Sequence, residues 1–363
     1  MKNLVKLGTL TSIRTGKLDA NASSENGKYP FFTCSKEPLR IDSYSYNCEC
    51  VLVAGNGDLN VKYYDGKFDA YQRTYIIEST DKSKLLVKYL YFFLDIYVEV
   101  LRTQSIGGVI KYIKLGNLTD AMIPLPCIEE QEVIVDRLEK CNDLLNRRIR
   151  QLAILDQLVK SRFVELFGDP AMNTKGWEIE KAEKHIDLLS GFPFDSSHYT
   201  ECGIKICGGL IIMPQRIDWD SCKYWSSIEG FEEYTLREND IVMALDRPWI
   251  SEGFKVAMVD ADELPALLIQ RTARIRAVDI NQHYLMYCFI LGGFDNHCNV
   301  TGSLVPHISA KDIRSFPIML PSIELQEQFS TFVEQTNKSK VAIQAALDKT
   351  QLLFDSLMQK YFG

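Results

Sequence analysis

Hydrophobic side chains recur at every seventh position in the middle of the chain, within a segment that contains neither proline nor glycine. This segment extends from residue 128 to residue 167. Such spacing is typical of a helix that packs along one side against another helix. The sequence therefore predicts one long helix, about 60 Å in length at 1.5 Å per residue. Its expected inner row consists of Leu138, Leu145, Leu152, Val159 and Leu166.

The end of the chain repeats this helix and the residues that lead into it. Residues 123–168 align with residues 318–363 without a gap, at a constant offset of 195 positions. We therefore expect a second helix from about Ser322 to Phe362, with Lys340 interrupting its inner row. Two such helices can form an antiparallel pair that relates two halves by an approximate two-fold axis, although each could instead pack only on its own domain. The second inner row consists of Val333, Leu347, Phe354 and Tyr361.

The segments before the two helices have mixed patterns. Short strands are predicted at residues 50–54 and 75–77, tight turns at Asn56-Gly57 and Asp65-Gly66, and a helix at residues 85–101. Gln72-Arg73-Thr74 of the first mixed segment recurs as Gln270-Arg271-Thr272 in the second. We predict an α+β fold, with two globular mixed α/β domains joined by two long antiparallel coiled-coil helices. The expected boundaries are 1–122, 123–168, 169–317 and 318–363.

The charge of the chain is unevenly distributed. Residues 1–122 carry 16 basic and 13 acidic side chains, whereas residues 171–317 carry 14 and 21. Nucleic-acid binding by the second globule would therefore need a local basic patch or a partner that supplies positive charge.

Several classes of protein are disfavoured by the sequence. No run of 18 apolar residues and no signal peptide is visible, so we expect a cytoplasmic protein. The ten cysteines and five histidines show no zinc-ligand spacing, and no phosphate-binding glycine loop occurs. Asp65-Gly66-Lys67 with Asp58 could be imagined as a nuclease remnant, but a hairpin turn is the favoured interpretation.

The segment that opens each helix carries a family resemblance. Residues 123–132, Ile-Pro-Leu-Pro-x-Ile-Glu-x-Gln-Glu, resemble the conserved region of specificity subunits of Type I restriction–modification systems, as does their repeat at residues 318–327. The bridge at residues 167–178 is also similar to that family. The resemblance covers nearly the whole chain, and other matching stretches are residues 55–57, 71–74, 244–249, 270–272, 301–303 and 306–308. The first copy departs from the closing motif at Lys111-Tyr112-Ile113.

This resemblance implies a non-catalytic subunit whose two globules are target-recognition domains for a bipartite DNA sequence. The helix pair would be a spacer and the docking surface for methyltransferase subunits, expected to be two, and for restriction subunits. S-adenosylmethionine, ATP and Mg²⁺ would be bound by these partners and not by this chain, for which no metal site and no membrane association are expected. Two alternatives stay open: the same subunit in a standalone or Type IIB-like methyltransferase, and an interaction adaptor without a DNA role.

Candidate DNA contacts were chosen by residue type and motif, because phosphates attract lysine and arginine, and polar side chains read bases. The shared Gln-Arg-Thr motif could instead hold the fold, since one motif cannot by itself read two different half-sites. In the first globule the candidates are Lys62, Tyr63, Tyr64, Lys67, Gln72, Arg73, Lys111 and Lys114. In the second they are Arg247, Trp249, Lys255, Gln270, Arg271, Ser303, His307 and Lys311.

Overall fold

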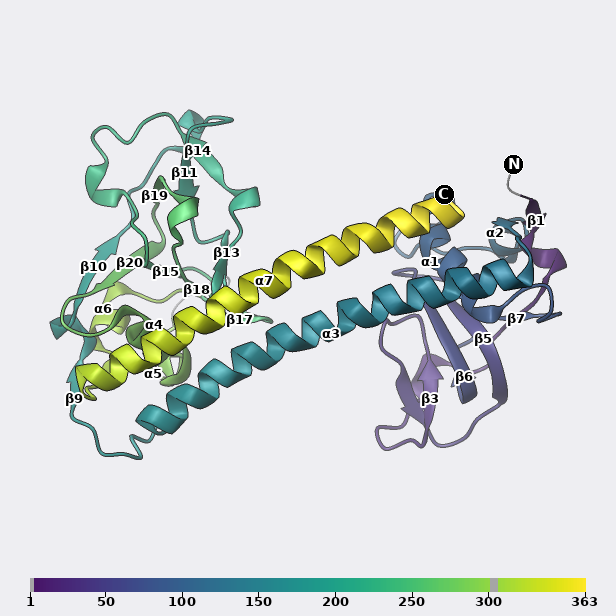
Figure 1. Ribbon diagram of the computed structural model, residues 1–363, viewed down its shortest axis with the longest axis horizontal. Helices are drawn as coiled ribbons and strands as arrows, with labels where there is room; N and C mark the ends of the chain where they lie inside the picture. Colours follow the sequence, from purple (N-terminus) through teal and green to yellow (C-terminus); the bar gives the residue numbers. More distant parts are fainter. Residues whose placement is uncertain (1–2, 301–305) are drawn as a thin grey trace. The chain divides into compact units, whose positions relative to one another are not determined.

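The computed structural model describes residues 3–300 and 306–363, which divide into two units. Unit 1 extends to Arg150 and also includes Gln344–Gly363, whereas unit 2 is Gln151–Ile343. Each unit thus combines one globule with a part of both long helices, α3 (Ile128–Phe167) and α7 (Ile323–Phe362) (Figure 1). Both long helices are therefore shared between the two units.

Within each unit the long helices run antiparallel. In unit 1, Arg137 donates a hydrogen bond to the Tyr361 hydroxyl at 3.0 Å, and Arg148 donates to Thr350. In unit 2, Lys340 forms an ion pair with Asp156, and the Phe163 ring lies 5.3 Å from the Phe329 ring. Residue numbers rise along one helix as they fall along the other in every one of these contacts. The predicted antiparallel pairing is confirmed in both units.

Every residue of the two predicted inner rows is buried or half-buried. Leu138, Leu145, Val159 and Val333 are buried, and Leu152, Leu166, Leu347, Phe354 and Tyr361 are half-buried. Two charged residues of the long helices have partners. Lys340, which interrupts the second row, pairs with Asp156, and Arg148 donates to Thr350 and to the Ala346 carbonyl. A charged side chain at such a seam needs a partner because desolvation without one is costly.

A six-stranded sheet with the strand order β2-β7-β5-β6-β3-β4 forms the globule of unit 1. Helix α1 packs against β5 and β6 of this sheet (Figure 1). The elements are β1 (Leu4–Lys6), β2 (Thr11–Thr15), β3 (Tyr29–Phe32), β4 (Leu39–Ile41), β5 (Tyr46–Ala54), β6 (Val61–Ala70), β7 (Thr74–Ser79), α1 (Val87–Gln104), α2 (Leu115–Thr119) and β8 (Met122–Pro124).

The prediction of a tight turn at Asp65-Gly66 is wrong. These two residues lie inside β6, where Asp65 pairs with Glu49 and Gly66 with Cys48 of β5. The glycine has a φ of 138°, which a strand can accept only at a residue without a Cβ. The nuclease remnant is not supported either, because no group of three or more metal-ligating side chains occurs among residues 3–300 and 306–363.

Shorter strands build the globule of unit 2, in two main sheets with the orders β10-β20-β15-β18 and β14-β11-β19. Helix α4 packs against β18 and β20. The elements are β9 (Ile179–Lys181), β10 (Ile186–Ser190), β11 (Ile204–Cys207), β12 (Ile212–Met213), β13 (Arg216–Ile217), β14 (Lys223–Trp225), β15 (Ile241–Ala244), β16 (Trp249–Ile250), β17 (Gly253–Phe254), β18 (Val256–Met258), β19 (Ala266–Leu268), β20 (Thr272–Ala277), α4 (Gln282–Leu291), α5 (Phe294–His297), α6 (Ala310–Ser315) and β21 (Pro317–Met319).

The two units attach their helices in the same way. At the start of α3, the buried Gln131 amide donates to the Pro126 carbonyl at 3.0 Å. At the start of α7, Gln326 donates to the Pro321 carbonyl at 2.9 Å. Each glutamine also accepts a hydrogen bond from the main chain of its globule, just before α1 or α4. The repeated Glu-x-Gln motif therefore fixes each long helix to its globule.

The far end of each helix is held by a matching aromatic contact. In unit 1, the Phe362 ring at the end of α7 lies 5.0 Å from the Tyr89 ring of α1. In unit 2, the Phe167 ring at the end of α3 lies 4.7 Å from the Tyr284 ring of α4. All four residues belong to the hydrophobic cores of their units. None of the helices that the structure describes combines the length and the hydrophobicity needed to span a membrane.

Candidate nucleic-acid interface

Three loop segments of the first globule meet where β5 ends and β7 begins. The Gly55 amide donates to the Arg73 carbonyl at 2.8 Å, and the Ile113 amide donates to the Gly55 carbonyl at 2.9 Å. The Gly57 amide donates to the Lys111 carbonyl at 2.9 Å. We call this group of residues, 55–57, 72–74 and 111–113, tip 1.

The second globule builds the same arrangement from equivalent segments. The Leu245 amide donates to the Arg271 carbonyl at 2.9 Å, and the Ile308 amide donates to the Leu245 carbonyl at 2.9 Å. The Arg247 amide donates to the Pro306 carbonyl at 2.7 Å. We call residues 245–247, 270–272 and 306–308 tip 2. The structure thus brings together motifs that lie far apart in the sequence, and the two tips share one main-chain design.

The Gln-Arg-Thr motif has a structural part and an exposed part. Thr74 and Thr272 are buried, and the main-chain amides of Gln72 and Gln270 each donate at 2.8 Å to a neighbouring loop. The arginine side chain points outward, and that of Arg271 is 72% exposed. The expectation that the motif holds the fold is therefore supported for its backbone and threonine, while its arginines stay candidates for DNA contact.

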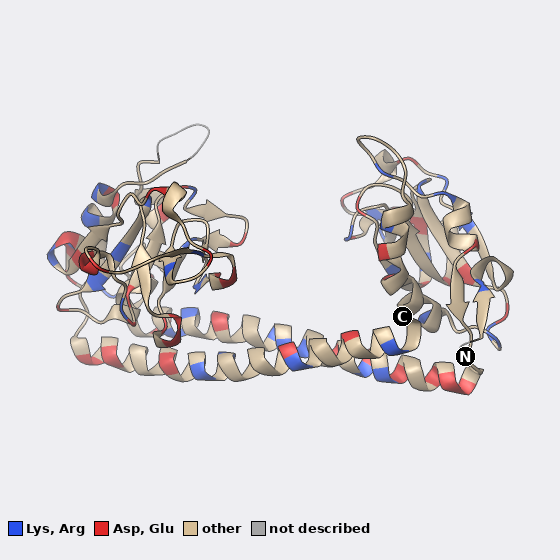
Figure 2. Ribbon diagram, turned by 90° about the horizontal axis from the view of Figure 1, so that it is seen from above, with Lys and Arg blue, Asp and Glu red and all other residues tan. Residues whose placement is uncertain are grey.

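Tip 2 concentrates positive charge on an otherwise acidic globule, over which charges of both signs are interspersed (Figure 2). Arg247 and Arg271 are exposed there, and Arg271 forms an ion pair of 2.8 Å with Asp246. Lys255 lies near these arginines. Its pKa is lowered, first by burial and second by the positive charge of Arg247. Tip 2 therefore presents two exposed arginine side chains on a globule that carries more acidic than basic residues.

Backbone geometry at tip 2 is unusual. Arg247 has a φ of 44° and Arg271 a φ of 64°, a region that residues with a Cβ rarely occupy. In tip 1 the position of Arg247 is taken by Gly57, with a φ of 69°. Non-glycine residues held in this conformation are often found at functional sites, where the surrounding structure fixes them.

Tip 1 carries a different set of side chains on the same backbone. Gln72, Arg73 and Lys111 are exposed, and Asn56 stands where tip 2 has Asp246. Three of the eight candidate contacts of the first globule thus converge on this tip. Lys114 is also exposed, at the residue that precedes α2.

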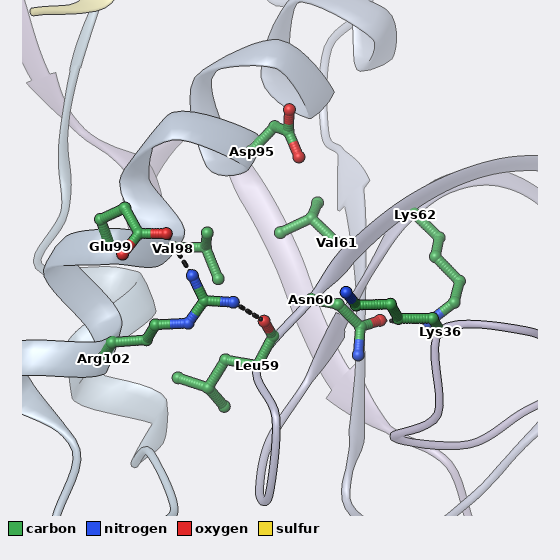
Figure 3. A pocket seen from close by; sticks show the side chains of 9 residues that line it. All are labelled: Lys36, Leu59, Asn60, Val61, Lys62, Asp95, Val98, Glu99 and Arg102. Atoms are coloured by element: carbon green, nitrogen blue, oxygen red, sulfur yellow. Dashed lines mark hydrogen bonds and ion pairs between the residues drawn. The ribbon is translucent and has the colours of Figure 1, made fainter. Parts of the chain in front are cut away.

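The remaining candidates of the first globule lie on β6, outside tip 1. Lys62 is half-buried at a cavity of about 370 Å³, donates to Asn60, and has a pKa lowered by burial (Figure 3). In the same cavity the Arg102 guanidinium lies between Glu99 and the Leu59 carbonyl.

The two tyrosines on β6 have structural partners. The Tyr63 hydroxyl donates to Glu49 at 2.9 Å, and the Tyr64 ring packs 5.0 Å from that of Phe32. Lys67 is exposed, with its ammonium 4.8 Å from the Tyr44 ring. The two tyrosines therefore have structural roles in the globule that do not require a DNA contact. Lys67, by contrast, is exposed and could reach DNA.

Two candidates of the second globule have structural partners. The half-buried Trp249 ring stacks 5.3 Å from the Phe254 ring, and both pack against the hydrophobic core. Lys255 is 5% exposed, and its ammonium donates to the Gly209 carbonyl. Burial therefore argues against a direct phosphate contact by Lys255, a state that residue type alone could not reveal.

The other candidates of the second globule have mixed placements. Gln270 and His307 belong to tip 2, and Lys311 is exposed on α6. Ser303 lies outside the described residues. The sequence-based candidates did not include Asp246, which pairs with Arg271. Its position within the matching stretch at residues 244–249 was the one signal that could have suggested it.

Comparisons with known proteins show which proteins this chain and its fold are similar to. Residues 2–153 match the family model of the Type I restriction modification DNA specificity domain. The chain therefore carries such a domain, and the predicted resemblance to the specificity subunits of these systems is confirmed.

Two relatives with known names are similar to this chain over different shares of their length. The Type I restriction enzyme EcoDI specificity subunit of Escherichia coli is 39% identical over 181 residues, which are 48% of this chain but only 39% of that protein. The MjaVIII specificity subunit of Methanocaldococcus jannaschii is 24% identical over 385 residues, covering 95% of this chain and 90% of that protein.

Solved structures show the same fold. The S subunit of a Type I restriction–modification system from M. genitalium has a TM-score of 0.65 and 17% identity, and the match covers 100% of this chain and 96% of that one. A chain from a structural study of complex assembly and conformational transition in the type I R–M system has a TM-score of 0.52 and 16% identity, with 99% and 97% covered. The predicted α+β fold class is confirmed.

Proposed function

We propose that this chain selects a bipartite DNA target, with tip 1 and tip 2 each reading one half. The observation that carries the proposal is the shared main-chain design of the two tips, together with their different side chains. A common backbone would dock each globule on DNA in the same way. Differences such as Asn56 against Asp246 and Gly57 against Arg247 would let the two half-sites differ.

Electrostatics support the same role. Exposed arginine or lysine side chains occur in both tips, among them Lys111 in tip 1 and Arg247 in tip 2. Phosphates attract such side chains and position the protein, after which polar groups can reach base edges.

The helix pair would act as a spacer and a docking surface. Half-sites on one face of a duplex are about 34–36 Å apart, or a multiple of this distance. Exposed hydrophobic residues lie on both helices, which favours contact with another protein. They include Val133, Leu144, Leu158, Val341 and Leu352.

The expected partners are methyltransferase subunits, two because the two units repeat the same helix attachment, and restriction subunits. S-adenosylmethionine would belong to the methyltransferase, and ATP and Mg²⁺ to the restriction subunits. The same chain could serve a standalone or Type IIB-like methyltransferase, and co-purification from the native host would identify which subunits bind it.

The test is methylation of a randomised duplex library by the chain in complex with its methyltransferase subunit. We expect a single motif of two separated half-sites, and a steep loss of DNA affinity as salt rises, because counterions are released on binding. A complex that methylates without sequence preference, or DNA affinity that is insensitive to salt, would contradict the proposal and favour the interaction adaptor.

A further inference from the structure

Asp246 and Arg271 make tip 2 different from tip 1 in a way that bears on base recognition. Arg271 Nη1 lies 2.8 Å from Asp246 Oδ2, although 72% of the arginine side chain is exposed. In tip 1 the corresponding residues are Arg73 and Asn56, and a neutral amide cannot form an ion pair with the arginine. One edge of the Arg271 guanidinium is therefore held, while the rest of the group faces solvent.

The main chain at Arg271 is also fixed. Its carbonyl accepts the Leu245 amide at 2.9 Å, and the next residue, Thr272, is completely buried. Arg271 has a φ of 64°, whereas Arg73, which accepts the equivalent bond in tip 1, has a negative φ. The surrounding structure thus holds Arg271 in a conformation that is unfavourable for a residue with a Cβ, which fixes the direction of its Cα–Cβ bond.

A guanidinium fixed in this way suits one kind of ligand. Its N–H donors lie in one plane and match the O6 and N7 acceptors of guanine in the major groove. The neighbouring Asp246 carboxylate would repel a phosphate, so the pair favours a base edge over the DNA backbone. A contact with phosphate alone would not require a carboxylate beside the arginine.

We propose that Arg271, positioned by Asp246, reads a guanine in the half-site bound by the second globule. This inference rests on the proposed function and assigns a base to one residue of tip 2. Arg271 is the contacting residue, and Asp246 acts only through it. Tip 1 lacks the pair, so the first half-site has no equivalent guanine contact from Arg73.

The test compares variants of the full chain, each in complex with the methyltransferase subunit, on a randomised duplex library. Arg271→Lys keeps the charge but loses the planar fork, so we expect the preference for guanine to fall about tenfold at one position. Asp246→Asn is expected to give a smaller loss at the same position. The first half-site should not change in either variant.

Arg216→Lys is the matched control, because Arg216 is also an exposed arginine of the second globule but lies outside tip 2. It should leave both half-sites unchanged. An active Arg271→Lys complex with an unaltered motif would overturn the inference, and so would a uniform loss of affinity for all sequences. If the unmodified complex selects no bipartite motif, the proposed function fails instead.

Discussion

The two units of this protein are alike where the helices join the globules and different where the globules could meet DNA. Gln131 and Gln326 make equivalent hydrogen bonds, as do the main-chain segments of tip 1 and tip 2. The side chains of the tips differ, with Asn56 in one and Asp246 in the other. The two units thus share their helix attachment and the main chain of their tips, while the side chains that the tips carry differ.

The prediction with the largest expected effect concerns the two long helices, which we propose to be a spacer between the globules. One heptad inserted at Arg150 in α3, with a matched heptad at Gln344 in α7, adds about 10 Å of helix. We expect the spacer of the methylated sequence to lengthen by about three base pairs, at about 3.4 Å each. Sequencing of methylated bases in a host that carries the variant and its methyltransferase measures this.

Both half-sites should keep their sequence in this variant, because neither tip is changed. An altered half-site with an unchanged spacer would contradict the role of the helices as a ruler. A heptad inserted in α3 alone is the control, since it mismatches the seam and is expected to abolish methylation.

A second prediction tests whether the helix attachments are truly equivalent. Gln131→Ala and Gln326→Ala each leave buried main-chain groups without a partner, which costs about 2–3 kcal/mol of unfolding free energy. Urea unfolding should show losses of similar size, and hydrogen exchange should place them in unit 1 for the first variant and in unit 2 for the second. Gln151→Ala, an exposed glutamine of α3, is expected to change little. Very unequal losses would show that one attachment matters more than the other.

The smallest expected effect concerns a position where the units differ. Unit 2 has His283, hydrogen-bonded to Ser330 at 2.9 Å, where unit 1 has Lys88 paired with Glu139 at 2.5 Å. Burial lowers the pKa of His283 below its usual 6.5, although Glu334 acts in the opposite direction. The unfolded chain therefore binds this proton more readily, so the contribution to stability is present above about pH 6.5 and is lost as the pH falls below it.

We expect slightly faster hydrogen exchange in α4 at pH 5 than at pH 7, relative to α1, after correction for intrinsic rates. His283→Gln should remove this difference, because glutamine does not titrate. An unchanged difference in that variant would assign the effect to another group.

The long helices were predictable to within a residue because their hydrophobic spacing and their flanking prolines are local signals. The sheets were less predictable: Asp65-Gly66 has the composition of a turn but lies within β6, because long-range pairing with β5 outweighs local preference. The candidate site was predicted in part. Arg73, Lys111, Arg247, Arg271 and His307 converge on the tips, whereas Lys255 is buried.

The two related halves and the two long helices could be read from the chain alone, since a repeat and a heptad pattern are local features of a sequence. The meeting of distant loops, the ion pair of Asp246 with Arg271 and the burial of Lys255 became visible in the folded protein. Burial and ion pairing depend on contacts between residues far apart in the chain, and residue type does not encode those contacts locally.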